Sequence, residues 1–146
     1  MGYTLSPGPG SMPDEFPSFL MVQTTTRCNA ACIFCPYPVV SKEIPRREMS
    51  FTLFRKLMNE CSRHPRLGGI MLYLMNEPLT DPQLVDRIDY AKQRNPETPI
   101  IICTNGCNLD RVTVDGLLGS GLDLVDTQEA EARAVADAPS PCGAAP

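Results

Sequence analysis

The sequence has no long apolar segment and no surplus of positive charge. None of its apolar runs approaches the roughly 20 residues that a membrane-spanning helix needs. Its 13 lysines and arginines face 17 aspartates and glutamates, so the net charge is −4. Residues 1–120 are balanced, with twelve charges of each sign, and therefore offer no basic surface that would favour nucleic acid. Neither a membrane nor a nucleic acid is expected as a partner.

The first 17 residues lack the basic and apolar regions of a secretory signal. They are rich in glycine and proline, which predicts a flexible arm. The seven cysteines do not indicate a disulfide framework, because their number is odd and three of them are clustered. We interpret them as thiols of a reducing cytoplasm, with the cluster serving as a metal site.

The clustered cysteines are Cys28, Cys32 and Cys35, which directly follow an apolar segment typical of a strand. Three thiolates on one loop suit an iron–sulfur cluster or zinc. A structural zinc site takes four ligands, and the single histidine, His64, lies far along the chain. Ligand number and spacing therefore favour iron–sulfur. With three cysteine ligands one metal stays open to a substrate, whereas a ferredoxin-like electron carrier would need a fourth.

Apolar segments of two kinds alternate along the chain. Short continuous runs predict strands over 19–26, 70–74, 99–103 and 122–125. Helical spacing predicts helices over about 50–63, 81–95 and 110–118, with Ser50 and Asp81 as N-caps of the first two. Strands separated by helices imply right-handed crossovers and a parallel sheet. The fold class expected is α/β.

Polar residues follow each of the first three strands. The cysteine loop comes after the first, Asn76-Glu77-Pro78 after the second and Thr104-Asn105-Gly106 after the third. Because the carboxyl ends of parallel strands share one edge, these loops are expected to form one site. Plainer alternatives remain open. Glu77 is then a solvated loop carboxylate or an acid that precedes a helix, and residues 104–106 are a plain Asn-Gly turn.

These residues resemble the radical S-adenosylmethionine (radical SAM) superfamily over about residues 18–126. That family carries a Cys-x3-Cys-x-aromatic-Cys motif after its first strand, matched here by Cys28, Cys32, Phe34 and Cys35. Its Gly-Gly-Glu-Pro-like segment corresponds to residues 75–78, with both glycines replaced. Such variants, and a Thr-Asn-Gly after strand three, are similar to the branch of SPASM-domain and peptide-maturing enzymes.

The resemblance implies a partial parallel (β/α) barrel, of which about four strands and three helices are present. It implies that the three cysteines hold a [4Fe-4S] cluster whose fourth iron binds SAM. Reductive cleavage of SAM then gives a 5′-deoxyadenosyl radical, which abstracts hydrogen from a substrate. The resemblance places Phe34 near the adenine, Asn76 and Glu77 at the methionyl group, and Thr104 and Asn105 at further polar contacts. It assigns no separate catalytic residue.

The implied partners are an unknown peptide or small-molecule substrate and an electron donor such as flavodoxin or ferredoxin. A closed eight-stranded barrel needs roughly 200 residues or more, whereas this chain has 146. We therefore expect an arm over 1–17, a truncated core over 18–127 and a disordered or non-homologous tail over 128–146. An open sheet edge predicts poor solubility. The alternative to an enzyme is a catalytically inactive iron–sulfur-binding fragment or binding protein.

Overall fold

The computed structural model describes residues 16–32 and 35–127. Four strands alternate with helices in these ranges. In chain order the elements are β1 (Phe19–Met21), α1 (Tyr37–Val40), α2 (Phe51–Cys61), β2 (Gly69–Met71), the 3-10 helix η1 (Pro78–Thr80), α3 (Leu84–Arg94), β3 (Ile100–Thr104), α4 (Arg111–Leu118) and β4 (Leu124–Thr127). None of these helices has both the length and the apolar character needed to span a bilayer.

The strands form one sheet in the order β1-β2-β3-β4, and every neighbouring pair is parallel. Leu20 lies opposite Ile70, and Ile70 lies opposite Ile100. Sequential strands are thus spatial neighbours, as right-handed crossovers in one direction produce. This arrangement confirms the predicted α/β fold with a partial parallel (β/α) barrel.

The first two strands are shorter than the sequence predicts. β1 ends at Met21, although the amide of Val22 still donates to the carbonyl of Met71 at 2.8 Å. Beyond that point the chain is held by other partners: Thr25 forms an antiparallel bridge with Glu48. The second strand, β2, ends at Met71. The amide of Leu74 beyond it donates to the side chain of Asn76 instead of to a neighbouring strand.

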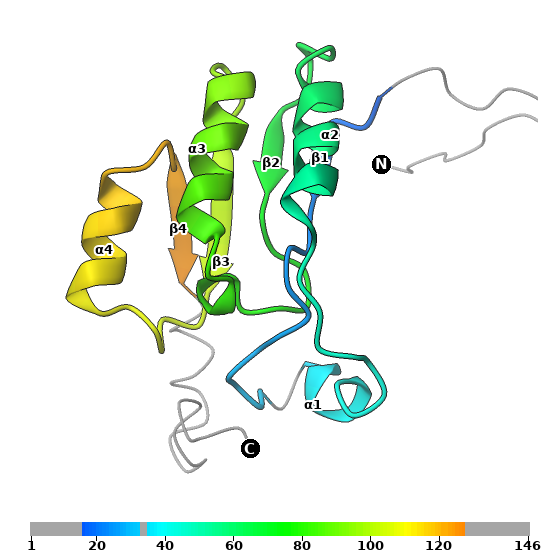
Figure 1. Ribbon diagram of the computed structural model, residues 1–146, viewed down its shortest axis with the longest axis vertical. Helices are drawn as coiled ribbons and strands as arrows, with labels where there is room; N and C mark the ends of the chain where they lie inside the picture. Colours follow the sequence, from blue (N-terminus) through cyan, green and yellow to red (C-terminus); the bar gives the residue numbers. More distant parts are fainter. Residues whose placement is uncertain (1–15, 33–34, 128–146) are drawn as a thin grey trace, which may run out of the picture.

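Helices α2, α3 and α4 lie on one face of the sheet (Figure 1). Burial along β3 alternates between buried and half-buried residues, because successive side chains of a strand point to opposite faces. Each large apolar side chain in such a core contributes about 1.5–3 kcal/mol. Those fully buried here are Phe54, Met58, Ile70, Leu72, Ile88, Ile100 and Ile102.

The opposite face of the sheet has no helix over it in the described part of the chain (Figure 1). The register places Met21, Met71, Ile101 and Leu124 in one row on this open face. Met21 is 45% exposed and Leu124 is 53% exposed. β4 is an edge strand with all of its residues exposed, so the expected open edge is present. Poor solubility stays a prediction, and the proposed arm and tail lie almost wholly outside the described residues.

Two of the expected helix starts are observed, and one is wrong. The side chain of Ser50 accepts from the amide of Leu53 and caps α2 as predicted. Helix α4 begins after Asp110, whose carboxylate accepts from the amide of Thr113 at 2.7 Å. Asp81, however, does not cap α3, which begins only at Leu84.

Asp81 has a different partner. One carboxylate oxygen accepts from the amide of Gln83 at 2.9 Å, and the other accepts from Nε of Arg87 at 2.9 Å. Both side chains of this ion pair are fully buried. The guanidinium also donates to the carbonyl of Met49 and lies over the rings of Phe51 and Phe54. The pair therefore joins α3 to the start of α2.

Candidate functional site

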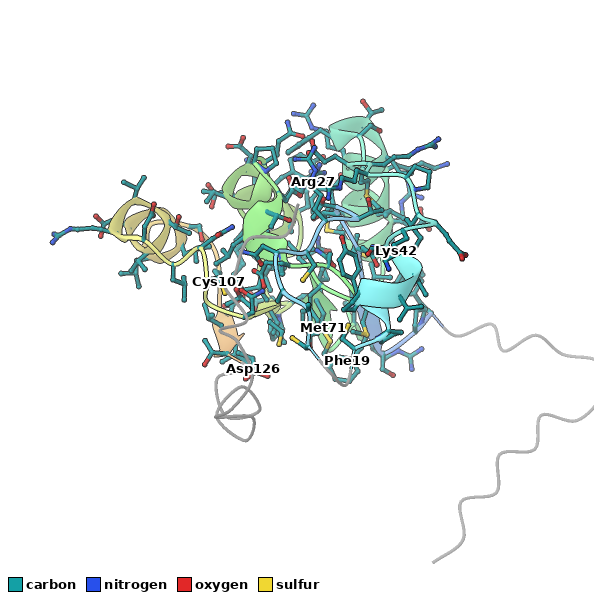
Figure 2. The ribbon with its side chains drawn as sticks, turned by 90° about the horizontal axis from the view of Figure 1, so that it is seen from below. Phe19, Arg27, Lys42, Met71, Cys107 and Asp126 are labelled. Atoms are coloured by element: carbon teal, nitrogen blue, oxygen red, sulfur yellow. The ribbon has the colours of Figure 1, made fainter. Side chains whose placement is uncertain are left out.

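Three loops meet at the carboxyl ends of the strands. The loop after β1 carries the cysteines, the loop after β2 carries Asn76 and Glu77, and the loop after β3 begins with Asn105. Figure 2 views the molecule from this end, with Arg27, Lys42 and Cys107 labelled around it. The convergence expected from the parallel sheet is therefore observed.

Glu77 connects all three loops. It is only 2% exposed. Its carboxylate accepts from the hydroxyl of Thr104 at 2.6 Å and from the amide of Asn105 at 2.8 Å. It also accepts from the amide of Leu79 at 3.0 Å, and its own amide donates to the carbonyl of Arg27 at 2.9 Å. The solvated-carboxylate alternative is thus wrong, because the Glu77 side chain is buried. The helix-preceding alternative is confirmed, because Glu77 is the N-cap of η1. Its other hydrogen bonds hold the loops against one another.

Asn76 has a buried amide group with an unused donor. Its Oδ1 accepts from the amide of Leu74 at 3.0 Å. Its Nδ2 is buried and has no hydrogen-bond partner among the described residues. A buried polar group without a partner costs free energy, so it commonly marks a place where a ligand or water binds. This donor lies on the loop where a cofactor was expected.

Residues 104–106 form a turn. Thr104 is buried, and its hydroxyl accepts from the amide of Gly106, whose φ of 75° suits glycine. The side-chain oxygen of Asn105 accepts from the amide of Cys107 at 3.0 Å. The side-chain Nδ2 of Asn105 donates to Oδ1 of Asn29, within the cysteine loop, at 2.8 Å. These side-chain-to-backbone bonds are those of a turn, and the side chain of Asn105 also joins this segment to the cysteine loop.

The cysteine loop brings its three thiols to this edge. Cys28 and Cys35 are half-buried and Cys32 is exposed. The amide of Cys35 donates to the carbonyl of Cys32 at 3.1 Å. Burial raises the pKa of the Cys28 thiol, and the negative charges of Glu77, Cys32 and Cys35 raise it further. Phe34, the expected adenine contact, lies outside the described residues.

The cysteine loop can be compared with the ligand set of an iron–sulfur cluster. Within residues 16–32 and 35–127, no three cysteine, histidine or acidic side chains are arranged to hold a single metal ion. The donor chemistry nevertheless fits, because three soft thiols share one short loop. Bound cationic iron would also favour the Cys28 thiolate, whereas burial and, to a smaller extent, neighbouring negative charges raise the pKa of this thiol. The unpartnered Asn76 amide adds a donor for a polar cofactor.

Sequence reasoning missed two residues that organise the loop. Tyr37 follows the last cysteine by two positions, is buried, and bonds to the loop through its hydroxyl. Asn29 lies between the first two cysteines and donates to the side chain of Asn108 as well as accepting from Asn105. For Tyr37 the only sequence signal is its nearness to the motif. The partners of Asn29 are more than 70 residues away, and spacing along the chain cannot reveal them.

A family model described as "Radical SAM superfamily" matches residues 22–128. That range includes the cysteine motif and all three loops. The chain belongs to the radical SAM superfamily. Radical SAM proteins generally use a [4Fe-4S] cluster and S-adenosylmethionine, in which the cofactors supply the difficult chemistry.

Curated radical SAM relatives are similar over most of this chain. The S-adenosyl-L-methionine-dependent 2-deoxy-scyllo-inosamine dehydrogenase of Niallia circulans is 30% identical over 121 residues, or 82% of this chain and 48% of the relative. The tungsten-containing aldehyde ferredoxin oxidoreductase cofactor-modifying protein of Pyrococcus furiosus is 29% identical over 107 residues, covering 73% and 29%. Molybdenum cofactor biosynthesis protein 1 of Bos taurus is 32% identical over 114 residues, covering 75% and 17%.

Solved structures give the same family. The crystal structure of BtrN in complex with AdoMet and 2-DOIA superposes with a TM-score of 0.69 at 29% identity, covering 79% of this chain and 47% of that one. Selenomethionine BtrN in an open conformation has a TM-score of 0.67 at 23% identity, covering 80% and 59%, and supports the fold alone. The chain thus spans about half of BtrN and less than half of the curated relatives.

Proposed function

We propose that this radical SAM chain binds a [4Fe-4S] cluster through Cys28, Cys32 and Cys35 and uses it with SAM. The observation that carries the proposal is the connection made by Glu77, which joins the cysteine loop to the loops after β2 and β3 at one sheet edge. A cluster on the first loop would lie beside polar groups of the other two.

Different residues of the chain would bind the cluster and SAM. The three thiolates would bind three irons, which leaves the fourth iron for SAM. The unpartnered Nδ2 of Asn76 would donate to a SAM oxygen. Glu77 would receive the methionyl ammonium as a further charge-assisted bond, and Thr104 and Asn105 would fix the turn beside it. When bound, the pair supplies reductive cleavage to a 5′-deoxyadenosyl radical for hydrogen abstraction.

The substrate proposed is a small molecule or peptide. The names of the relatives concern an inosamine dehydrogenation, a cofactor modification and a cofactor biosynthesis. Their targets differ although their similarity to this chain is comparable, so the shared core specifies the chemistry rather than the target. A flavodoxin or ferredoxin is the electron donor proposed.

Anaerobic reconstitution of the 146-residue chain tests this function. After reduction with dithionite in the presence of SAM, we expect 5′-deoxyadenosine by chromatography and mass spectrometry. Replacing all three loop cysteines with alanine should abolish it. Cys61→Ala is the matched control, because Cys61 is a buried thiol of α2 away from the loop, and it should retain the product.

The same experiment distinguishes the second candidate, a cluster-binding protein without radical chemistry. The open face and the exposed edge strand β4 favour this candidate, since no element of the described part of the chain covers them. A four-iron spectrum without 5′-deoxyadenosine would support it. Absence of any cluster spectrum would contradict both candidates.

A further inference from the structure

Tyr37 contacts the loop of the first cysteine through its hydroxyl group. Its Oη accepts from the amide of Cys28 at 2.9 Å and donates to the carbonyl of Thr26 at 2.8 Å. The residue is only 9% exposed. One hydroxyl therefore pairs a donor and an acceptor that flank Arg27, at the start of the cysteine loop.

Tyr37 also contacts the third cysteine, through its backbone. Its amide donates to Sγ of Cys35 at 3.5 Å. Tyr37 is thus bonded to both ends of the motif, to the backbone of Cys28 and to the sulfur of Cys35.

The segment after Tyr37 is also hydrogen-bonded to Thr26. The hydroxyl of Thr26 donates to the carbonyl of Pro45 and accepts from the amide of Arg47 at 2.8 Å. The amide of Thr26 donates to the carbonyl of Arg47 at 2.9 Å. The chain therefore passes from Thr26 through the cysteines and α1 and returns to Thr26. Tyr37 belongs to this closed loop, and the hydrogen bonds of its hydroxyl to Cys28 and Thr26 join two parts of the loop.

We propose that Tyr37 is a positioning residue that holds Cys28 and Cys35 at the spacing that the cluster requires. The inference rests on the proposed cluster binding. Hydrogen-bond partners that orient metal ligands typically change metal affinity 10–100-fold when they are removed. Tyr37→Phe keeps the ring and removes only the hydroxyl, which leaves the Cys28 amide and the Thr26 carbonyl without their partner.

Tyr90→Phe is the matched control. The hydroxyl of Tyr90 donates to Oδ1 of Asn59 at 3.1 Å, joining α3 to α2 far from the cysteine loop. Both substitutions thus delete one tyrosine hydroxyl that is hydrogen-bonded. Both apo proteins should show similar unfolding midpoints by circular dichroism.

The test compares the reconstituted full chain with its two variants. With the ferrous chelator ferrozine as the probe, we expect iron loss about tenfold faster from Tyr37→Phe than from wild type, and unchanged from Tyr90→Phe. The reduced-cluster EPR spectrum should broaden only in Tyr37→Phe. In the apo chain, hydrogen exchange of the Cys28 amide should be about tenfold faster only in that variant.

Two results would overturn the proposal. One is iron retention and Cys28 amide exchange in Tyr37→Phe that match those of Tyr90→Phe. The other is iron loss that merely follows a lowered unfolding midpoint of apo Tyr37→Phe, which would assign Tyr37 a general structural role. If wild type binds no cluster, the proposed function fails, and the Cys28 amide exchange still decides whether Tyr37 braces the loop.

Discussion

Replacing Glu77 with glutamine tests the contact that joins the three loops. The carboxylate accepts three hydrogen bonds, two at Oε1 from Leu79 and Thr104 and one at Oε2 from the amide of Asn105. A glutamine has one oxygen, which can keep the first two bonds. Its amide group then takes the place of Oε2 and presents hydrogens to the Asn105 amide, which is itself a donor.

The loss of the acceptor at Oε2 determines how much Glu77→Gln lowers the free energy of unfolding. A hydrogen bond to a charged group contributes about 1.5–3 kcal/mol, and an unsatisfied buried donor costs about 1–3 kcal/mol. Because Glu77 is 2% exposed, water cannot replace the lost acceptor. We therefore expect Glu77→Gln to lower the free energy of unfolding by about 2–4 kcal/mol. At roughly 4 °C per kcal/mol for a domain of this size, Tm should fall by about 10 °C.

Thermal and urea unfolding of the apo chain measure this effect without any contribution from SAM. Glu97→Gln is the control, since Glu97 is exposed, and it should change stability by less than about 0.5 kcal/mol. A Glu77→Gln chain as stable as Glu97→Gln would refute the reasoning. Glu77 would then serve the cofactor alone.

Three further predictions concern the scaffold. Arg87→Ala should cost about 3–5 kcal/mol in urea unfolding, because it leaves the fully buried Asp81 carboxylate unpaired. Burial alone would raise the pKa of Asp123, but hydrogen bonds from the Ile100 amide and Lys92 lower it below its ordinary 3.8. Its stabilisation is therefore present above that value and lost as pH falls through the folded pKa, and Asp123→Asn should flatten the acid limb of the stability curve. Gly121→Ala should lower stability by about 1–3 kcal/mol in thermal unfolding, because its Cβ would overlap the base of the Lys92 side chain.

Local signals in the sequence predict most of the framework. Continuous apolar runs such as Ile100–Cys103 identify the buried strands, and the hydroxyl of Ser50 marks the start of α2. These features depend on neighbours within a few residues. The convergence of the polar loops also follows, because it is a consequence of parallel strand order rather than of any single contact.

The partners of individual site residues could not be predicted in the same way. Glu77 reaches Thr104 and Asn105, and Asn29 reaches Asn108, across long stretches of chain. Such pairs depend on the final register of the sheet. The ends of the first two strands were overestimated for the same reason, because polar groups distant in the sequence bond to the backbone there.

Arg87 is a residue whose burial the sequence could have revealed. It shares the inner stripe of α3 with Leu84, Ile88 and Ala91 at helical spacing. A charge on an apolar stripe needs a buried partner. Asp81, six positions earlier and fully buried, is that partner, which explains why it does not cap the helix.

EPR spectroscopy of the reduced, reconstituted chain before and after addition of SAM tests the central claim most directly. If three thiolates hold the cluster and leave one iron open, SAM should change the four-iron signal, and the signal itself should vanish when Cys28, Cys32 and Cys35 are alanine. A four-iron signal that SAM leaves unaltered, or that survives loss of the three thiols, would contradict the account.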